Sequence, residues 1–256
     1  MKPDRPSNRG VSLVLRLLSL IFFSAVSATA ESPSPGSQVE MKLEVADLGE
    51  IPYLLYLPKN YEDKAEWPLI LFLHGRGESY GPLRLVQKWG PPRMAARGDD
   101  FPYVLVSPQC PEDDRWTSEI QQQLLVALLD SSLKSHRIDE NRVYLTGLSM
   151  GGYGSWRLAA DHPERFAAVV PICGRGDAND AGVLKDLPIW VFHGDQDGDV
   201  PFAASEKMVA AIREAKGTKI KFTSLEGVGH NSWSPAYALP ELYAWLNRQV
   251  REPQAE

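Results

Sequence analysis

The chain has 256 residues, a length that fits one large domain or two small ones. Its hydrophobic content of 43% and its charged content of 23% are ordinary for a globular protein. The formal net charge is −6 and no basic run or stripe occurs, which argues against a nucleic-acid partner.

The N-terminal segment has the pattern of an export signal. Basic residues precede a largely apolar run over 11–26, and residues 28–30 read Ala-Thr-Ala, as at a signal cleavage site. Arg16 interrupts the apolar run, so the run is too short to span a bilayer well as an anchor. We therefore expect 1–30 to be a cleaved signal peptide and the mature protein to be secreted or periplasmic. Cleavage would lower the formal charge from −6 to −9, and no later stretch is apolar enough for a membrane span.

Beyond this segment, predicted strands alternate with predicted helices. Residues 31–40, rich in Ser, Pro and Gly, are expected to form a flexible linker, and 41–250 a single α/β domain. The predicted strands are 41–45, 51–57, 68–74, 103–107, 142–146, 166–172, 188–193 and 220–225, and the main predicted helices are 118–135, 150–161, 203–215 and 239–250. The first two strands are expected to pair antiparallel. The alternation predicts a mostly parallel sheet with helices on both faces.

A Gly-Leu-Ser-Met-Gly turn occupies residues 147–151, between a predicted strand and a predicted helix. In that setting a G-x-S-x-G turn is a nucleophile elbow, which holds Ser149 in a strained conformation above the sheet. We expect glycine at 147 and 151 because the strand and the helix pass so close together there that a side chain would not fit. The start of the helix directs free N–H groups toward the same point, where a negative oxygen would be stabilised. The alternative is a turn that only links strand to helix.

A serine nucleophile needs an imidazole base, and the base needs a carboxylate to orient it. In a parallel sheet these groups are expected outside the carboxyl ends of the strands. Of the five histidines, His230 alone follows all the candidate acids, in the chain order Ser, acid, His. We therefore expect His230 to be the base. His74 and His193 each precede a glycine at a strand end and are expected to form local hydrogen bonds.

Three carboxylates compete for the role of the acid, because Asp195, Asp197 and Asp199 lie within five residues. Two of them could serve only turn chemistry. Their alternation also resembles part of a calcium loop, but the closing Glu is absent, so we expect no metal site. The residue pattern alone leaves the choice among the three open.

Several short stretches between Ile51 and Leu246 match one known superfamily. They are Tyr53-Leu54-Leu55-Tyr56-Leu57-Pro58, Leu73-His74-Gly75, Pro108-Gln109-Cys110-Pro111, Gly147-Leu148-Ser149-Met150-Gly151-Gly152, His193-Gly194-x-x-Asp197-x-x-Val200-Pro201 and Gly229-His230. On these motifs the chain resembles the α/β-hydrolase superfamily, in particular secreted esterases and prolyl-oligopeptidase-like predicted peptidases near the feruloyl and polyhydroxybutyrate esterases. The resemblance implies the α/β-hydrolase fold and Asp197 as the acid. It also implies an oxyanion hole formed by the N–H groups of Met150 and Arg76, with Gly77 as a minor alternative to Arg76.

Two tryptophans and two cysteines complete the candidates. Trp116 and Trp233 are expected in loops on the active face, as a flat apolar wall for an aromatic acyl group or a sugar, unless they cover the edge of the core. Cys110 and Cys173 each follow a predicted strand, at the same edge of the sheet. Export permits a disulfide between them, and two buried free thiols are the alternative.

Together these patterns predict a secreted serine hydrolase that cleaves small-molecule or polysaccharide-linked carboxylic esters through an acyl-enzyme, without a cofactor. A serine peptidase of prolyl-oligopeptidase type is the first alternative, although esters have the better leaving group and need less positioning. A non-catalytic carbohydrate-binding homologue is the second, against which the presence of Ser149, Asp197 and His230 argues.

Overall fold

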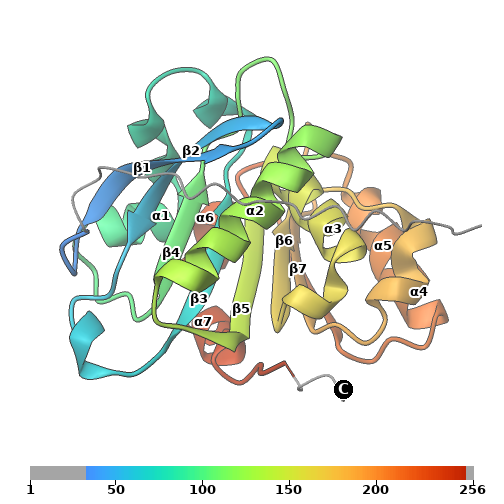
Figure 1. Cartoon of the computed structure of the whole chain (residues 1–256). Coiled ribbons are helices and arrows are strands. Elements are labelled where there is room, and N and C mark those ends of the chain that lie inside the picture. The colour runs from blue at the N-terminus through green and yellow to red at the C-terminus, as the bar shows by residue number, and fades with distance from the viewer. Residues whose placement is uncertain (1–32, 252–256) are drawn as a thin grey trace, which may run out of the picture.

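The computed structural model describes residues 33–251, so the predicted signal peptide at 1–30 lies outside the described residues. One eight-stranded sheet runs through this part of the chain, in the order β1-β2-β4-β3-β5-β6-β7-β8 (Figure 1). Its strands are β1 (Gln38–Val45), β2 (Gly49–Tyr56), β3 (Trp67–Leu73), β4 (Val104–Pro108), β5 (Ile138–Leu148), β6 (Ala168–Ile172), β7 (Ile189–Gly194) and β8 (Ile220–Leu225).

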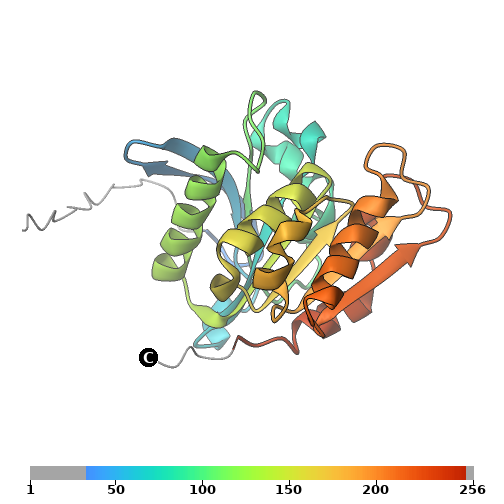
Figure 2. The ribbon, with the colours of Figure 1, turned by 90° about the vertical axis from the view of Figure 1, so that its right-hand side faces the viewer.

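Strand β2 runs antiparallel to both of its neighbours, β1 and β4, whereas all other neighbouring strands are parallel. Figure 2 shows the twist of this sheet from the blue β1–β2 pair toward β8 at the opposite edge. The predicted antiparallel opening pair and the mostly parallel sheet are therefore confirmed. Because β3, β5, β6, β7 and β8 are parallel, their carboxyl ends meet at one edge of the sheet.

Helices cover both faces of the sheet, as predicted. The α-helices are α1 (Gly90–Ala96), α2 (Glu119–Ser135), α3 (Met150–Asp161), α4 (Ala181–Leu184), α5 (Phe202–Glu214), α6 (Trp233–Tyr237) and α7 (Pro240–Leu246), and the 3-10 helices are η1 (Tyr61–Asp63), η2 (Arg76–Ser79), η3 (Leu83–Lys88), η4 (Pro163–Arg165) and η5 (Ala178–Asp180). Buried side chains of α2, α3, α4 and α5 form one core cluster with one face of the sheet. Those of α1, α6 and α7 form a second cluster with the other face.

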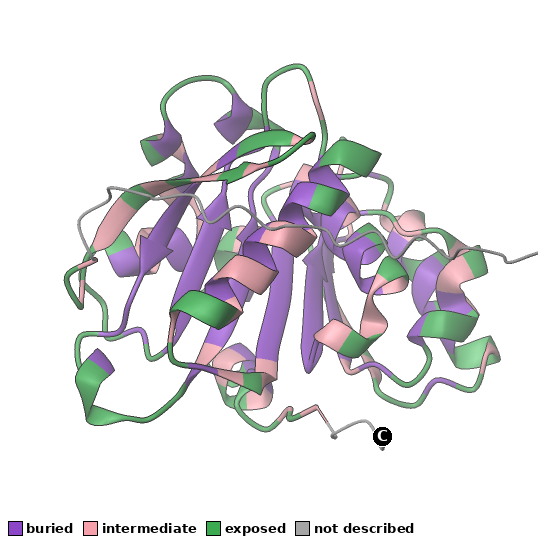
Figure 3. Ribbon diagram, viewed as in Figure 1, coloured by how far each residue is buried: buried purple, intermediate pink, exposed green. Residues whose placement is uncertain are grey.

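The central strands are buried on both sides, which explains their continuous apolar sequences. In Figure 3 they are purple along nearly their whole length, and each of β4, β6 and β7 is buried at every position. The edge strand β1 alternates between half-buried and exposed positions along most of its length, because only one of its faces packs on the core. The buried centre of the sheet thus supports the loops at the strand ends.

Several predicted boundaries differ from those in the structure, among them the start of β5, which lies at Ile138 rather than at 142. Strand β1 begins at Gln38, so the expected linker at 31–40 ends earlier than predicted, because residues 38–40 pair with β2. The helix predicted over 239–250 is shorter, since α7 spans only Pro240–Leu246, and it is preceded by the separate helix α6 at Trp233–Tyr237. Pro240 is the first residue of α7, and proline lacks the N–H that a continuous helix needs there. Within residues 33–251 we find no helix long and apolar enough to cross a bilayer.

The order of the strands decides whether Cys110 and Cys173 can form a disulfide. Cys110 and Cys173 are both buried and both free. They follow β4 and β6, and β3 and β5 lie between these strands. Three strand spacings amount to about 14 Å, twice the Cα–Cα distance of about 7 Å that a disulfide tolerates. Of the two alternatives, the buried thiols are the correct one.

Candidate active site

Ser149 lies on the sharp turn between β5 and α3, as predicted. Its φ of 51° and ψ of −116° are outside the regions that a residue with a side chain normally adopts. The turn is closed by glycine, since a Cβ on Gly147 would lie 2.4 Å from the Gly151 carbonyl oxygen. A Cβ on Gly151 would lie 1.9 Å from the carbonyl oxygen of Leu73. The start of α3 therefore lies in direct backbone contact with the end of β3.

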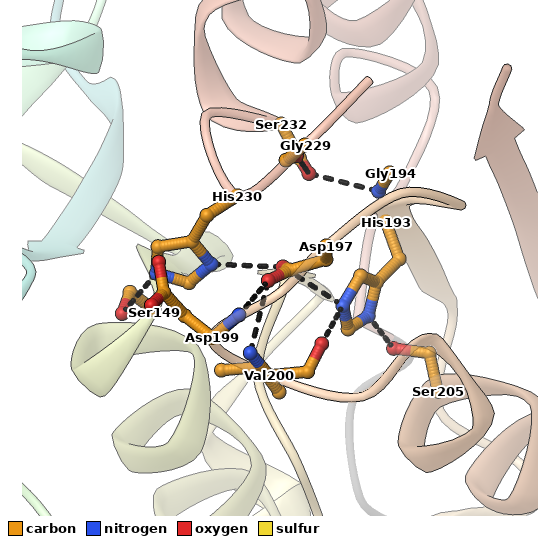
Figure 4. Close-up of polar contacts among 10 residues, drawn as sticks. All are labelled: Ser149, His193, Gly194, Asp197, Asp199, Val200, Ser205, Gly229, His230 and Ser232. Carbon is orange, nitrogen blue, oxygen red and sulfur yellow. Dashed lines mark hydrogen bonds and ion pairs between the residues drawn. The ribbon is translucent and has the colours of Figure 1, made fainter. Parts of the chain in front are cut away.

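His230 and Asp197 continue from Ser149 as a line of hydrogen bonds (Figure 4). The Nε2 atom of His230 lies 2.9 Å from Ser149 Oγ, and its Nδ1 atom lies 2.8 Å from Asp197 Oδ2. With Nδ1–H donating to the carboxylate, Nε2 is free to accept the serine proton. The structure thus brings together three residues that the sequence separates by up to 81 positions.

Of the three neighbouring carboxylates, only Asp197 bonds to His230. Its side chain is fully buried, and its Oδ1 atom accepts the backbone N–H groups of Asp199 and Val200 at 2.9 Å each. Burial would raise the pKa of the Asp197 carboxyl, but the hydrogen bonds from His230, Val200 and Asp199 outweigh it and lower that pKa. Asp195 instead accepts the Gly227 N–H at 2.8 Å, and Asp199 is exposed. Asp197 therefore remains an anion beside the imidazole.

The loop after β7 and the loop after β8 are fastened together, which positions the acid against the base. The buried Ser232 hydroxyl accepts the Gly194 N–H at 2.8 Å and donates to the Gly229 carbonyl at 3.2 Å. A Cβ on Gly194 would lie 2.1 Å from the carbonyl oxygen of Val228. Glycine is thus required for the close approach of the two backbones. The His-Gly-x-x-Asp motif does not by itself predict the hydrogen bonds of Ser232 or this role of Gly194.

The two predicted oxyanion donors begin two different helices. Met150 is the first residue of α3, and Arg76 is the first residue of η2. The first N–H groups of a helix have no carbonyl partner within it, so both are available to a ligand. The contact of Gly151 with Leu73 places the start of α3 beside the strand end that leads to Arg76. Buried Glu78 holds this turn, because its Oε2 atom accepts the Gly75 N–H at 3.1 Å.

The Arg76 side chain fastens the rim of the site. Its guanidinium donates to the carbonyls of Asp114 and Glu112 at 2.6 Å each and to the Tyr80 hydroxyl at 3.0 Å. The exposed Arg76 side chain is therefore hydrogen-bonded to the neighbouring loop.

The two tryptophans that were predicted to line the site lie in different environments. Trp233 is half-buried, and its ring meets the His230 ring edge to face at 5.3 Å. Trp89 packs against Trp233 at 5.8 Å. Trp116, by contrast, is fully buried, and its Nε1–H donates to the His74 carbonyl at 3.0 Å. The prediction that Trp116 forms an exposed wall was wrong, because this loop residue turns inward to fill the core below the His74 turn.

His74 and His193 both form local hydrogen bonds, as predicted. His74 Nε2 accepts the Cys110 N–H at 3.0 Å, so its Nδ1–H donates to the Gly75 carbonyl at 2.6 Å. Burial lowers the pKa of His74 to about 4, which keeps the ring neutral. His193, however, also bonds to Asp197, a contact that sequence reasoning missed. The signal was present in the H-G-x-x-D spacing, since a turn of that length can fold the Asp back onto the His.

One further group lies near these residues. Potential ligand atoms of Cys173, Asp197 and His230 lie within 4.8 Å of one another, the one such cluster in residues 33–251. Asp197 and His230 already bond to each other. Burial raises the pKa of the Cys173 thiol to about 12, so the sulfur is not the thiolate that metals bind. The cluster therefore consists of the hydrogen-bonded pair and a neutral thiol.

The chain is similar to several known proteins. Probable feruloyl esterase C of Aspergillus flavus is 24% identical over 228 residues, covering 86% of this chain and 82% of that protein. The bifunctional acetylxylan esterase/xylanase XynS20E of Neocallimastix patriciarum is 25% identical over 171 residues, or 62% of this chain and 23% of that protein. The crystal structure of a thermostable esterase superposes with a TM-score of 0.74 at 33% identity, covering 85% of this chain and 64% of that one. The chain thus spans less than two thirds of the length of two of these three proteins.

The family assignment rests on the match to a family model. The model described as "Putative esterase" matches residues 48–230, which include Ser149, Asp197 and His230. Because this match covers more than half of the chain, the chain belongs to this esterase family of the α/β-hydrolase superfamily.

Proposed function

We propose that the protein is a serine esterase that hydrolyses carboxylic esters through an acyl-enzyme. The observation that carries this proposal is the continuous line from Ser149 Oγ through His230 to Asp197 Oδ2, with hydrogen bonds of 2.9 and 2.8 Å. The line starts on a strained elbow at the carboxyl end of β5, next to the free N–H groups of α3. Family membership supports the same reaction class.

The proposed reaction has two halves. His230 Nε2 removes the proton of Ser149 as Oγ attacks the ester carbonyl carbon, and the N–H groups of Met150 and Arg76 stabilise the oxyanion. The C–O bond to the alcohol then breaks, and His230 returns the proton to the leaving alkoxide. A water molecule, deprotonated by His230, then attacks the acyl-enzyme by the same steps, and the acid is released as Ser149 regains its proton. Anionic Asp197 stabilises the imidazolium that forms in each half.

The proposed substrates are small-molecule or polysaccharide-linked esters. Two relatives are named as feruloyl and acetylxylan esterases, which act on esters of an aromatic acid and of acetate. Half-buried Trp233 stands at the His230 ring, where it would contact the bound ester. Its flat apolar face suits an aromatic acyl group or a sugar ring.

Secretion to the periplasm or the medium belongs to the same proposal and is supported by the basic, apolar and Ala-Thr-Ala segments in 1–30. N-terminal sequencing of the protein recovered from the expressing cells would test it. Cleavage after Ala30 is expected, and a mature protein that still begins at Met1 would contradict it.

Ser149→Ala tests the reaction itself. Turnover of p-nitrophenyl acetate is expected to fall at least about 10⁴-fold, because the nucleophile is gone while the fold is kept. Ser224→Ala is the matched control, since Ser224 is an exposed serine on β8. A serine-reactive phosphonate should label the peptide containing Ser149 in the wild type.

The rival functions separate in the same preparation. Peptide p-nitroanilides cleaved faster than methyl ferulate, acetylated xylo-oligosaccharides and p-nitrophenyl esters of increasing acyl length would favour a serine peptidase. A protein that binds carbohydrate but neither turns over an ester nor reacts with the phosphonate would be a non-catalytic homologue, and the proposal would fail.

A further inference from the structure

The buried carboxylate of Asp197 serves two histidines. Its Oδ2 atom lies 2.8 Å from His230 Nδ1 and 3.1 Å from His193 Nε2 (Figure 4). His193 comes from the end of β7 and is fully buried, so no solvent competes for this bond. A second imidazole thus contacts the same oxygen that orients the predicted base.

The partners of His193 determine which of its nitrogens carries the proton. Nε2 faces two acceptors, the Asp197 carboxylate and the Val200 carbonyl at 3.0 Å. Burial lowers the pKa of the His193 imidazole, although Val200 and Asp197 oppose that effect, so the ring is neutral. A neutral ring between these acceptors must carry its proton on Nε2 and donate from there.

Ser205 of α5 secures this tautomer. Its hydroxyl lies 2.7 Å from His193 Nδ1 and is fully buried. Since Nδ1 of this tautomer has a lone pair, the Ser205 O–H donates to it. Ser205 O–H therefore donates to Nδ1 of His193, and Nε2–H of His193 donates to Asp197.

We propose that His193 is a positioning residue, held in its tautomer by Ser205, which directs Asp197 Oδ2 toward His230. This inference rests on the proposed function. The hydrogen bonds from the backbone N–H groups of Asp199 and Val200 restrain only the Oδ1 atom of Asp197. The carboxylate could still rotate about that atom and move Oδ2. The N–H of His193 removes that freedom by fixing Oδ2 from the side opposite His230.

The N–H of His193 also disperses the carboxylate charge. The other titratable groups near Asp197 are His230, Cys173 and Asp199. The Cys173 thiol is neutral, because burial raises its pKa to about 12, and the Asp199 side chain is exposed. Loss of the His193 N–H would therefore leave a more concentrated charge on Oδ2, facing His230.

The test compares His193→Leu with His193→Gln, which keeps an N–H donor near the position of Nε2. Per site titrated with the phosphonate, kcat for p-nitrophenyl acetate should fall about tenfold in the Leu variant, the equivalent of one net hydrogen bond. KM should stay within about twofold, since the substrate does not contact His193. The acidic limb of the pH profile of kcat/KM should move about 0.5 unit to higher pH. The Gln variant should recover most of the loss.

Two further variants keep the test decisive. Phe202→Leu removes the ring that meets His193 edge to face at 5.7 Å but leaves its hydrogen bonds, so kcat and the pH profile should not change. Ser205→Ala serves if His193→Leu does not fold, and it should lower kcat about threefold with the same direction of pH shift, because the hydroxyl that holds Nδ1 of the His193 ring is lost.

Unchanged kcat and an unchanged pH profile in the Leu variant, or in Ser205→Ala if the former is not folded, would overturn the inference. An equal loss in the Leu and Gln variants, without a pH shift, would also overturn it, because only the ring volume would then matter. Failure of wild-type Ser149 to react with the phosphonate would instead refute the proposed function, so the two failures are distinguishable.

Discussion

The two sides of Asp197 have the same kinds of partners. On the outer side, His230 links the carboxylate to Ser149, and Trp233 meets its ring edge to face at 5.3 Å. On the inner side, His193 links the same oxygen to Ser205, and an aromatic ring again meets the imidazole edge to face, at 5.7 Å. Residue types alone therefore do not distinguish the proposed reacting side from the supporting side.

Exposure and backbone strain distinguish the two sides. The His230 side chain is 21% exposed, whereas that of His193 is 0% exposed and cannot meet a substrate. Ser149 sits at a φ of 51° on a turn, whereas Ser205 lies within the regular helix α5. Under the proposed function, the outer Ser–His–Asp set reacts because the fold exposes Ser149 more than Ser205 and places the N–H groups at the start of α3 beside it.

The largest effect is expected from removing the charge that both sides share. Asp197→Asn should lower kcat for p-nitrophenyl acetate by about 10⁴-fold, because the amide favours the wrong tautomer of His230 and does not stabilise its imidazolium. Asp199→Asn, two residues along the same loop, should change kcat by less than about threefold, since its exposed side chain does not contact His230. A greater loss in Asp199→Asn than in Asp197→Asn would assign the acid differently.

His74 provides a third, equally buried imidazole for the comparison. Burial lowers its pKa from 6.5 to about 4, so the unfolded chain binds a proton in this range that the folded chain does not. The resulting stability is complete above pH 6.5 and is lost as the pH falls toward 4, by about 3 kcal/mol. Urea unfolding at several pH values should show a flatter dependence for His74→Gln than for the wild type. Parallel curves would show that His74 titrates normally.

Replacing the outer aromatic ring should affect binding more than folding. Trp233→Ala should raise KM for methyl ferulate about tenfold and leave KM for p-nitrophenyl acetate within about twofold, because only the larger acyl group reaches the ring. Steady-state kinetics on both esters provides the measurement. Equal changes for the two substrates would argue that Trp233 supports His230 rather than the ester.

The smallest effects concern the two serines. Ser149→Gly should raise the free energy of unfolding by about 1 kcal/mol, because glycine adopts the positive φ without strain. Ser205→Ala should lower it by about 1 kcal/mol, because a buried hydrogen bond is lost. Denaturant titration of both variants measures the difference. A destabilised Ser149→Gly variant would mean that the elbow stores no strain.

Local patterns predicted the elbow and the strand-to-helix alternation well. Helix α3 and strand β8 have the predicted bounds. The role of His230 follows from chain order, whereas Asp197 could be separated from Asp195 and Asp199 only by resemblance. Each of these assignments depends on residues close together in the sequence or on a known motif.

Predictions that depend on spatial neighbours were less successful. Trp116 was assigned to the surface because loop position does not show which way a side chain turns, and Trp116 fills the core. The free state of Cys110 and Cys173 depends on which strands lie between β4 and β6, and strand order is not written in local sequence. The contact of His193 with Asp197 requires the folded loop after β7.

The acyl-enzyme is the central claim and can be observed directly. Wild-type protein would be mixed with p-nitrophenyl butyrate, quenched in acid within the first turnover, digested and examined by mass spectrometry. The account predicts a butyryl adduct on the peptide containing Ser149, which disappears as hydrolysis is completed. Rapid ester turnover without any adduct, or an adduct on another residue, would contradict it.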